Sequence, residues 1–210
     1  GVMQKIFSQE IRFKDENGND YPDWEEKRLG DMLSLVVDNR GKTPPISENG
    51  IPLIEINAVG QRDIQYHKIG KYVSNEVFEG WFRKYLSAGD VLFSTVGATA
   101  LCSIYDGRIP SVIAQNLVGL RFIDEDQSFM YYMLSEAHNN HKFKRIEMGA
   151  VQPSVKVSQM INIRFLVPNL LEQIEISRLL SVFDKKIALL ADGTEQLNIF
   201  KKGLLQQMFV

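Results

Sequence analysis

Three short stretches of the sequence carry residue types that enzymes use to make or break bonds. TPPI (43–46) contains a Pro-Pro pair, but it lacks the flanking Asn or Asp and the aromatic residue with which restriction-type methyltransferases grip a flipped adenine. PDWEEK (22–27) resembles a metal-dependent nuclease set, yet its acids are adjacent instead of lying on neighbouring strands. TVGATA (95–100) has too few glycines for a nucleotide-binding loop. We therefore predict no catalytic residue.

Two histidines have a spacing that could serve a metal ion. His138 and His141 lie three residues apart in a predicted helix. No third ligand is close in sequence, since Cys102 is remote, whereas structural zinc sites need four ligands and catalytic sites usually three. We expect both histidines to join a basic helix end, and we predict no metal site.

Basic and amide side chains in three other stretches suit contacts with DNA. NRGKTPP (39–45) places Arg40 and Lys42 beside two prolines, and the stiffness of this loop limits the entropy lost on binding. HKFKR (141–145) carries cations for phosphates, and the glutamine of VQPSV (151–155) can pair with an adenine edge. For each, the alternative is a solvated or turn-stabilising side chain. The candidate DNA-binding residues are Arg40, Lys42, Lys142, Lys144, Arg145, Gln152, Ser154 and Lys156.

Five short runs rich in β-branched and aromatic residues predict strands between about residues 28 and 168. They are bounded by Gly, Pro or Asp, and they are PLIEIN (52–57), DVLFSTV (90–96), LCSIY (101–105), NLVGLRF (116–122) and INIRFLV (161–167). Gln115 and Asn116 enter the fourth run. For these two amides we favour a structural role, in which they hydrogen-bond buried backbone, over a contact with bases.

Apolar residues at helical spacing predict two helices in the same block, over 74–86 and 126–146. Ser128 is placed to cap the second helix. The fold class we predict is α+β. Residues 28–168 would form one domain with a curved or partly closed β-sheet and flanking helices.

The last segment, 169–210, predicts one long helix. Pro168 precedes it and Asn169 can serve as its N-cap. Apolar residues alternate at spacings of four and three, as in a coiled-coil seam, and roughly 40 residues make a rod of about 60 Å. The predicted seam for a partner helix consists of Ile176, Leu180, Phe183, Ile187, Leu190, Leu197, Leu204 and Met208. The alternative is a helix folded back on the domain.

The two ends of the chain resemble each other. When GVMQKIFS (1–8) is aligned with GLLQQMFV (203–210), Gly, Gln and Phe coincide, a weak signal of an internal repeat. If the repeating unit is a domain followed by a long helix, residues 1–7 are the last turns of a preceding unit's helix. The polar stretch up to residue 27 is then a linker that Trp24 anchors to the next domain.

Composition limits the class of protein. With 44% hydrophobic and 24% charged residues among 210, the chain is typical of a soluble globular protein with a real core. A single cysteine excludes an internal disulfide and suits a reducing cytoplasm. No uninterrupted apolar stretch of about 18 residues predicts a membrane span. The formal net charge of −2 does not by itself indicate a nucleic-acid partner, although residues 138–164 are locally basic.

Four stretches, in order along the chain, resemble one family: the DNA-specificity subunit of type I restriction–modification systems. DWEEKRLGDML (23–33) is similar to the entry into a target-recognition domain, AGDVLFSTVGAT (88–99) to its Gly-Asp-strand-Gly element and VIAQNLVGLRF (112–122) to its Gln-Asn-Leu strand. Residues 149–187 resemble the exit, where a Gln-Pro turn leads through a strand and a Pro to Glu-Gln and the conserved-region helix. The series covers nearly the whole chain, as one unit where the family commonly has two.

The resemblance implies a non-catalytic reader of DNA. In this family, each target-recognition domain reads a few base pairs in the major groove of one half of a split site. Two conserved helices pack antiparallel and hold the two domains apart. The expected partners are double-stranded DNA, methyltransferase subunits, restriction (motor-nuclease) subunits and a second recognition unit through the antiparallel helix, with no membrane. This chain would hold no cofactor, since S-adenosylmethionine, ATP and Mg²⁺ would belong to partner subunits.

Two other functions stay open from the residues alone. The chain could be the recognition end of a single-chain restriction–methylation enzyme, which a methyltransferase motif encoded upstream would favour. It could instead be a coiled-coil scaffold without DNA binding. That function predicts that Arg40→Ala and charge reversal at Lys142 and Lys144 leave DNA affinity unchanged.

Overall fold

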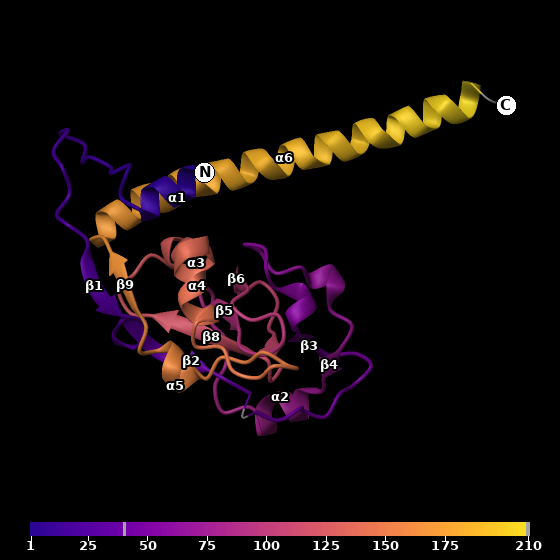
Figure 1. Ribbon diagram of the computed structural model, residues 1–210. Helices are drawn as coiled ribbons and strands as arrows, with labels where there is room; N and C mark the ends of the chain where they lie inside the picture. The colour runs from indigo at the N-terminus through magenta and orange to yellow at the C-terminus, as the bar shows by residue number, and fades with distance from the viewer. Residues whose placement is uncertain (40, 209–210) are drawn as a thin grey trace.

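The chain consists of a mixed α+β body that carries one long helix, α6 (Leu170–Met208) (Figure 1). The structure, a computed structural model, describes residues 1–39 and 41–208, with the backbone alone at 207 and 208. Among the described helices, none is both long enough and apolar enough to cross a membrane. The predicted α+β class and the long C-terminal helix are confirmed.

Three small sheets build the body over the part of the chain that the structure describes. The largest is antiparallel and has the strand order β2-β8-β5-β6, formed by β2 (Leu33–Val37), β8 (Leu117–Phe122), β5 (Val91–Ser94) and β6 (Cys102–Ile104). The second has the order β4-β3-β7, formed by β4 (Tyr72–Val73), β3 (Ile51–Ile54) and β7 (Val112–Ile113), with β3 and β7 parallel. The third pairs β1 (Glu25–Arg28) with β9 (Arg164–Val167). Four of the five predicted runs contain a strand, and the remaining run, over 52–57, overlaps β3.

Short helices surround the sheets. They are α1 (Val2–Phe7), α2 (Asn75–Trp81), α3 (Gln127–Ser135), α4 (Ala137–Lys144) and α5 (Val157–Met160), with 3-10 turns η1 (Leu29–Met32), η2 (Ile56–Ala58) and η3 (Tyr66–Lys68). The helix predicted over 74–86 is therefore shorter than expected, since α2 ends at Trp81.

The single helix predicted over 126–146 is wrong, because the structure has two helices there. Glu136 ends α3 and begins α4 with an extended backbone (φ −61°, ψ 136°), and its carboxylate accepts the Asn139 N–H at 2.9 Å. The predicted Ser128 cap is also wrong. Asp126 caps α3 by accepting the Phe129 N–H at 2.7 Å. Side-chain oxygens that satisfy the first N–H groups of a helix explain both boundaries.

The start of α6 belongs to the body's own core. Ile176 and Leu180 are buried in the largest core cluster, and α3 packs against α6. The prediction that these two residues contact a partner helix is therefore wrong. The spacing of a coiled-coil seam is also the spacing of an apolar stripe that packs on the core of the same chain. Tyr132 donates to Asp184 Oδ2 at 2.6 Å, close to the point where α6 leaves the body.

The Gly-Asp element before β5, Gly89 and Asp90, links neighbouring segments by hydrogen bonds. The Asp90 carboxylate is buried and accepts the Ser87 N–H at 2.8 Å and two Arg121 guanidinium bonds at 2.8 and 2.9 Å. The hydrogen bond to Asp90 raises the pKa of Arg121. Gly89 has φ +92°, and a Cβ there would lie 2.6 Å from the Gln127 side chain, so only glycine fits this turn.

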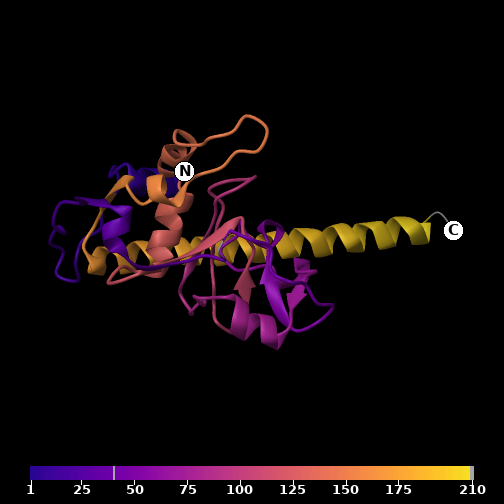
Figure 2. The same ribbon diagram turned by 90° about the horizontal axis from the view of Figure 1, so that it is seen from below.

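The N-terminal segment packs against the body as well. In α1, Ile6 is fully buried in the same core cluster as the first turns of α6, and the Phe7 ring contacts the rings of Trp24 and Phe129. Figures 1 and 2 both show α1 running in the direction opposite to α6. Trp24 is buried, which confirms it as an anchor. That residues 1–7 end a preceding unit's helix stays a prediction.

Candidate nucleic-acid interface

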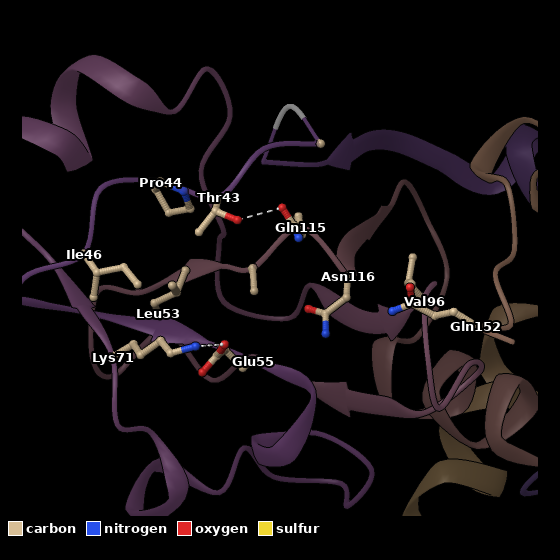
Figure 3. Close-up of a pocket in the computed structure, with 12 residues that line it drawn as sticks. Thr43, Pro44, Ile46, Leu53, Glu55, Lys71, Val96, Gln115, Asn116 and Gln152 are labelled. Carbon is tan, nitrogen blue, oxygen red and sulfur yellow. Dashed lines mark hydrogen bonds and ion pairs between the residues drawn. The ribbon is translucent and has the colours of Figure 1, made fainter.

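A cleft of about 440 Å³ is lined by residues of six stretches that are separate in sequence (Figure 3). One wall comes from the loop over 41–46 and the opposite wall includes Gln152. Two of the stretches chosen from the sequence, 39–45 and 151–155, thus border the same hollow. Between them lie residues that follow β3 and β7, including Gln115 and Asn116.

Half of the polar side chains described in this cleft are amides, and the others are one hydroxyl and one ion pair. Thr43 Oγ1 donates to Gln115 Oε1 at 3.0 Å, and Lys71 Nζ lies 2.8 Å from Glu55 Oε1 (Figure 3). The interpretation of Gln115 as a partner of buried backbone is wrong, because its side chain is exposed and bonds a hydroxyl on the cleft wall. A carboxamide offers both a donor and an acceptor, which is the pattern of a nucleobase edge.

Asn116 also differs from the sequence-based interpretation. Its backbone carbonyl, not its amide, makes the structural bonds: it accepts the Thr95 N–H at 2.8 Å and the Thr95 hydroxyl at 3.2 Å. Among the described residues, its buried Oδ1 has no hydrogen-bond partner. A buried acceptor without a partner costs free energy, so it marks a place where a ligand's donor would be stabilising.

The turn over 148–154 projects from the body and carries Gln152 (Figure 2). Met148 and Ser154 exchange two backbone hydrogen bonds of 2.8 Å, which close the turn. Gly149 has φ +90°, and a Cβ there would lie 2.6 Å from the Gln152 carbonyl oxygen. The Ser154 hydroxyl faces the Met148 carbonyl at 3.4 Å, so this side chain points back into the turn. Val151, at the tip, is completely exposed.

The two lysines predicted to clamp phosphates have partners inside the body. Lys142 Nζ donates to the Arg164 carbonyl at 2.9 Å and lies 4.8 Å from the centre of the Phe165 ring. Burial lowers the pKa of the Lys142 ammonium. Lys144 Nζ donates to Thr99 Oγ1 at 2.7 Å. The expectation of a solvent-facing cation needs correction for Lys142, which is half-buried and packed against Phe165. Lys144 is exposed, and its contact with phosphates stays a prediction.

The remaining basic candidates are placed differently. Lys42 is exposed beside the cleft, in a loop that the Asn39 amide braces by donating to the Lys42 carbonyl at 3.1 Å. Arg145 and Lys156 are exposed at the end of α4 and before α5. Arg40 lies outside the described residues. The structure therefore joins the loop and the turn at one cleft, and it does not join the α4 cations to that cleft.

The histidines form no ligand set. His138 and His141 are both exposed on α4. Within residues 1–39 and 41–208, no group of three His, Cys, Asp or Glu side chains is close enough to hold a metal ion. Of the two, only His141 lies in the basic last turn of α4, whereas His138 lies at the start of the helix, so the expectation that both join the basic end is wrong for His138.

Beyond the body, α6 presents an apolar edge to solvent. Every residue from 185 to 206 except Gly203 is exposed. Five predicted seam positions form this apolar edge, namely Phe183, Ile187, Leu190, Leu197 and Leu204, with exposed fractions between 40% and 69%. The Met208 side chain lies outside what the structure describes. Apolar surface exposed over this length is typical of a site for a partner.

Thr43, Gln115, Asn116, Glu55 and Lys71 were not chosen as site residues from the sequence. They come together only through the parallel pairing of β3 with β7 and the packing of the 41–46 loop. The one local signal is the Gln-Asn pair at the start of an apolar strand, where two amides are unusual enough to draw attention.

Comparisons with known proteins agree with this architecture. The model of the type I restriction modification DNA specificity domain matches residues 21–198. The putative type I restriction enzyme MjaX specificity subunit of Methanocaldococcus jannaschii is 27% identical, over 99% of this chain and 50% of that protein. The MjaVIII specificity subunit of the same organism is 22% identical, over 98% and 51%. The chain thus spans about half the length of the curated relatives it matches.

Solved structures share the fold. A chain of a type I R-M system, from work on its assembly and conformational transition, has a TM-score of 0.64 at 20% identity, covering 90% of this chain and 45% of that one. The HsdS subunit from Thermoanaerobacter tengcongensis has a TM-score of 0.61 at 20% identity, covering 91% and 44%. The S subunit from M. genitalium has a TM-score of 0.56 at 16% identity, covering 87% and 43%. These matches do not favour the two alternative functions, the recognition end of a single-chain restriction–methylation enzyme and a coiled-coil scaffold without DNA binding. The family model covers most of the sequence, and the chain belongs to the type I restriction modification DNA specificity family.

Proposed function

We propose that the chain reads one half of a bipartite DNA site and positions the methyltransferase and restriction subunits of a type I restriction–modification complex. The observation that carries the proposal is the family match over residues 21–198, which includes the cleft and most of α6. In this proposal the chain makes and breaks no bonds. S-adenosylmethionine, ATP and Mg²⁺ act on the partner subunits, and the complex works in the cytoplasm.

The cleft and the projecting turn are the reading surface in this proposal. Gln152 stands on the turn that the Met148–Ser154 backbone hydrogen bonds close, and the major groove, about 12 Å wide, admits a two-stranded β-ribbon. The amides of Gln115 and Asn116 line the floor behind it. Carboxamides pair bidentately with adenine, whereas Lys42 beside the cleft suits a phosphate. Base contacts would give sequence preference and phosphate contacts would give register.

The exposed part of α6 is the spacer in this proposal. Half-sites on one face of DNA lie about 34–36 Å apart per helical turn, so two reading units need a rigid connection. The whole helix of 39 residues extends about 60 Å, and its part beyond the body, from residue 185 to Met208, extends about 36 Å, which is long enough for one such step. The partner on its apolar edge is the antiparallel helix of a second recognition unit. The direction of α1, opposite to α6, supports this arrangement.

A binding experiment on mixed sequences tests the proposal. The chain is reconstituted with methyltransferase subunits and a second recognition unit, and electrophoretic shifts are measured on a pool of randomised duplexes. We expect the shifted fraction to be enriched in one split sequence, and we expect affinity to fall steeply with salt. Equal affinity for every sequence would refute the reading role.

A further inference from the structure

Two adjacent polar side chains in the first turn of α6, Glu172 and Gln173, are fully buried. The reading surface does not include them. Burying a carboxylate is costly unless it is paired and fully hydrogen-bonded. The hydrogen-bond partners of these two side chains therefore indicate their structural role.

Glu172 binds the chain that enters the body. Arg12 donates to it through Nε at 2.9 Å and through Nη2 at 3.1 Å, a two-point contact between a guanidinium and a carboxylate. Trp24 Nε1 donates to the same carboxylate at 3.1 Å, and the Arg12 guanidinium lies 5.9 Å from the centre of the Trp24 ring. Arg12 also donates to the Pro22 carbonyl at 2.8 Å. The first turn of α6 is thus fastened to a segment about 160 residues earlier.

Gln173 binds the opposite side. Its Oε1 accepts the Asp126 N–H at 2.9 Å, and its Nε2 donates to the Pro168 carbonyl at 2.9 Å and to Glu125. Glu125 in turn accepts from Lys27 Nζ at 2.9 Å. The two side chains together bond α6 to the entering segment, to the loop before α3 and to the strand exit. We call this set of contacts the clamp.

We infer that Glu172 and Gln173 are positioning residues that fix the direction in which α6 leaves the body. Apolar packing against α3 is non-directional, whereas these hydrogen bonds fix distances and angles on two sides of the helix. Direction matters because the rod is long: a tilt of about 10° moves the end of a rod of about 60 Å by roughly 10 Å. The consequence for DNA, a fixed spacing between half-sites, rests on the proposed function.

Distances between two spin labels test the clamp on the chain itself. Labels are attached through Lys5→Cys on α1 and Gln196→Cys on the exposed part of α6, both at exposed positions. Native Cys102 is buried, and burial raises the pKa of its thiol to about 12, so it resists labelling. We expect one narrow distance distribution in the parent chain. In Glu172→Gln, we expect its width to grow at least twofold.

A second variant separates positioning from folding. Arg12→Met combined with Glu172→Met replaces the ion pair by apolar side chains of similar size, a change that often leaves stability unaffected. We expect the chain to stay folded, with a melting temperature lowered only by the loss of the acceptor of the Trp24 N–H, and a distribution as broad as in Glu172→Gln. The matched control is Glu175→Met with Arg178→Met, which removes an exposed ion pair of 2.8 Å from the same helix and should leave the width unchanged.

The outcomes are distinct for the clamp and for the proposed function. A parent-like width in both clamp variants, or a broad distribution in the parent chain, would overturn the inference. In the reconstituted complex, clamp variants should methylate sites whose spacer is one base pair longer or shorter, which the parent complex rejects. If the parent complex shows no sequence preference at all, the proposed function fails while the distance measurements still decide the clamp.

Discussion

Single amides, more than single charges, distinguish the cleft chemically. Gln115, Asn116 and Gln152 all line it, and among its described lining residues the one ammonium, on Lys71, is paired with Glu55. A surface of this kind gives little non-specific attraction to phosphates but can distinguish the edges of base pairs. Sequence preference should therefore depend on a few side chains whose removal leaves the fold intact.

Gln152→Ala should relax base preference without lowering stability. Because Gln152 is exposed on the projecting turn, truncation leaves no buried gap. We expect discrimination at one base pair to fall by about 1–3 kcal/mol, measured by competition between duplexes that differ at single positions. Gln159→Ala, at an exposed position on α5 away from the cleft, is the control. Full discrimination in the Gln152 variant would exclude it as a reader.

Lys42→Gln should weaken binding to all sequences alike. An exposed ammonium at the cleft edge is placed for a phosphate, whose neutralisation releases counterions. We expect the slope of log affinity against log salt concentration to fall by about 1, with base preference unchanged. Lys202→Gln, on the exposed part of α6, should leave the slope as it is. A change in base preference would instead assign Lys42 a direct contact with a base.

How far the sequence could identify site residues depends on the distance to their partners. The 39–45 loop and the 151–155 turn were identifiable because Gly, Pro and polar residues give a local signal. The hydrogen bonds of Lys142 and Lys144 could not be predicted from the sequence, because their partners lie 22 and 45 residues away along the chain. The cleft amides were missed for the same reason. Their neighbours are set by strand pairing, which residue type alone does not specify.

Among the elements, α6 has two parts with different roles. Its first turns bury Ile176 and Leu180 in the body, and its last twenty or so residues expose their apolar edge. One regular spacing serves both parts, so the sequence predicted the helix but not where the body ends along it. The break at Glu136 was also hidden, because the helical apolar spacing continues across it while the cap depends on backbone geometry.

Ile187→Glu combined with Leu190→Glu should prevent self-association of the chain. Both side chains are 63% exposed on the apolar edge, and a charge there must lose water when two helices pair. We expect weak association of the parent chain in sedimentation at high concentration and a monomer in the double variant, with the same melting temperature. Gln196→Glu with Asn198→Glu, at other exposed positions, is the control. A parent chain that is strictly monomeric would contradict an unfilled seam.

Gly193→Ala should strengthen the exposed part of α6. Glycine in a helix interior costs about 1 kcal/mol relative to alanine, and a Cβ at 193 would meet nothing within 4 Å. We expect higher helicity by circular dichroism and a later loss of helix on heating. Gly89→Ala is the opposite case, since its positive φ and its contact with Gln127 predict a loss of stability. Equal effects of the two substitutions on stability would contradict the helical backbone at Gly193 and the positive φ at Gly89.

At the scale of the whole molecule, the proposed DNA-reading surface and the proposed spacer lie on different parts of the chain, the body and α6. The cleft is lined by residues of the body, and α6 leaves the body after the clamp that joins Glu172 to Arg12 and Trp24. If the connection between body and helix is rigid, the length of the paired helices sets the distance between the two half-sites that the complex can read. The fold class and the order of the parts were predictable from the sequence, because they follow from local patterns and from the family resemblance.

The most direct test is a map of methylated adenines in DNA modified by the complete complex that contains this chain. The account predicts methylation at one split sequence with a fixed spacer. Exchanging residues 28–168 for the corresponding domain of a relative should change only one half of that sequence. Methylation at unrelated sequences, or an exchange that leaves both halves unchanged, would contradict the claim that this body reads DNA.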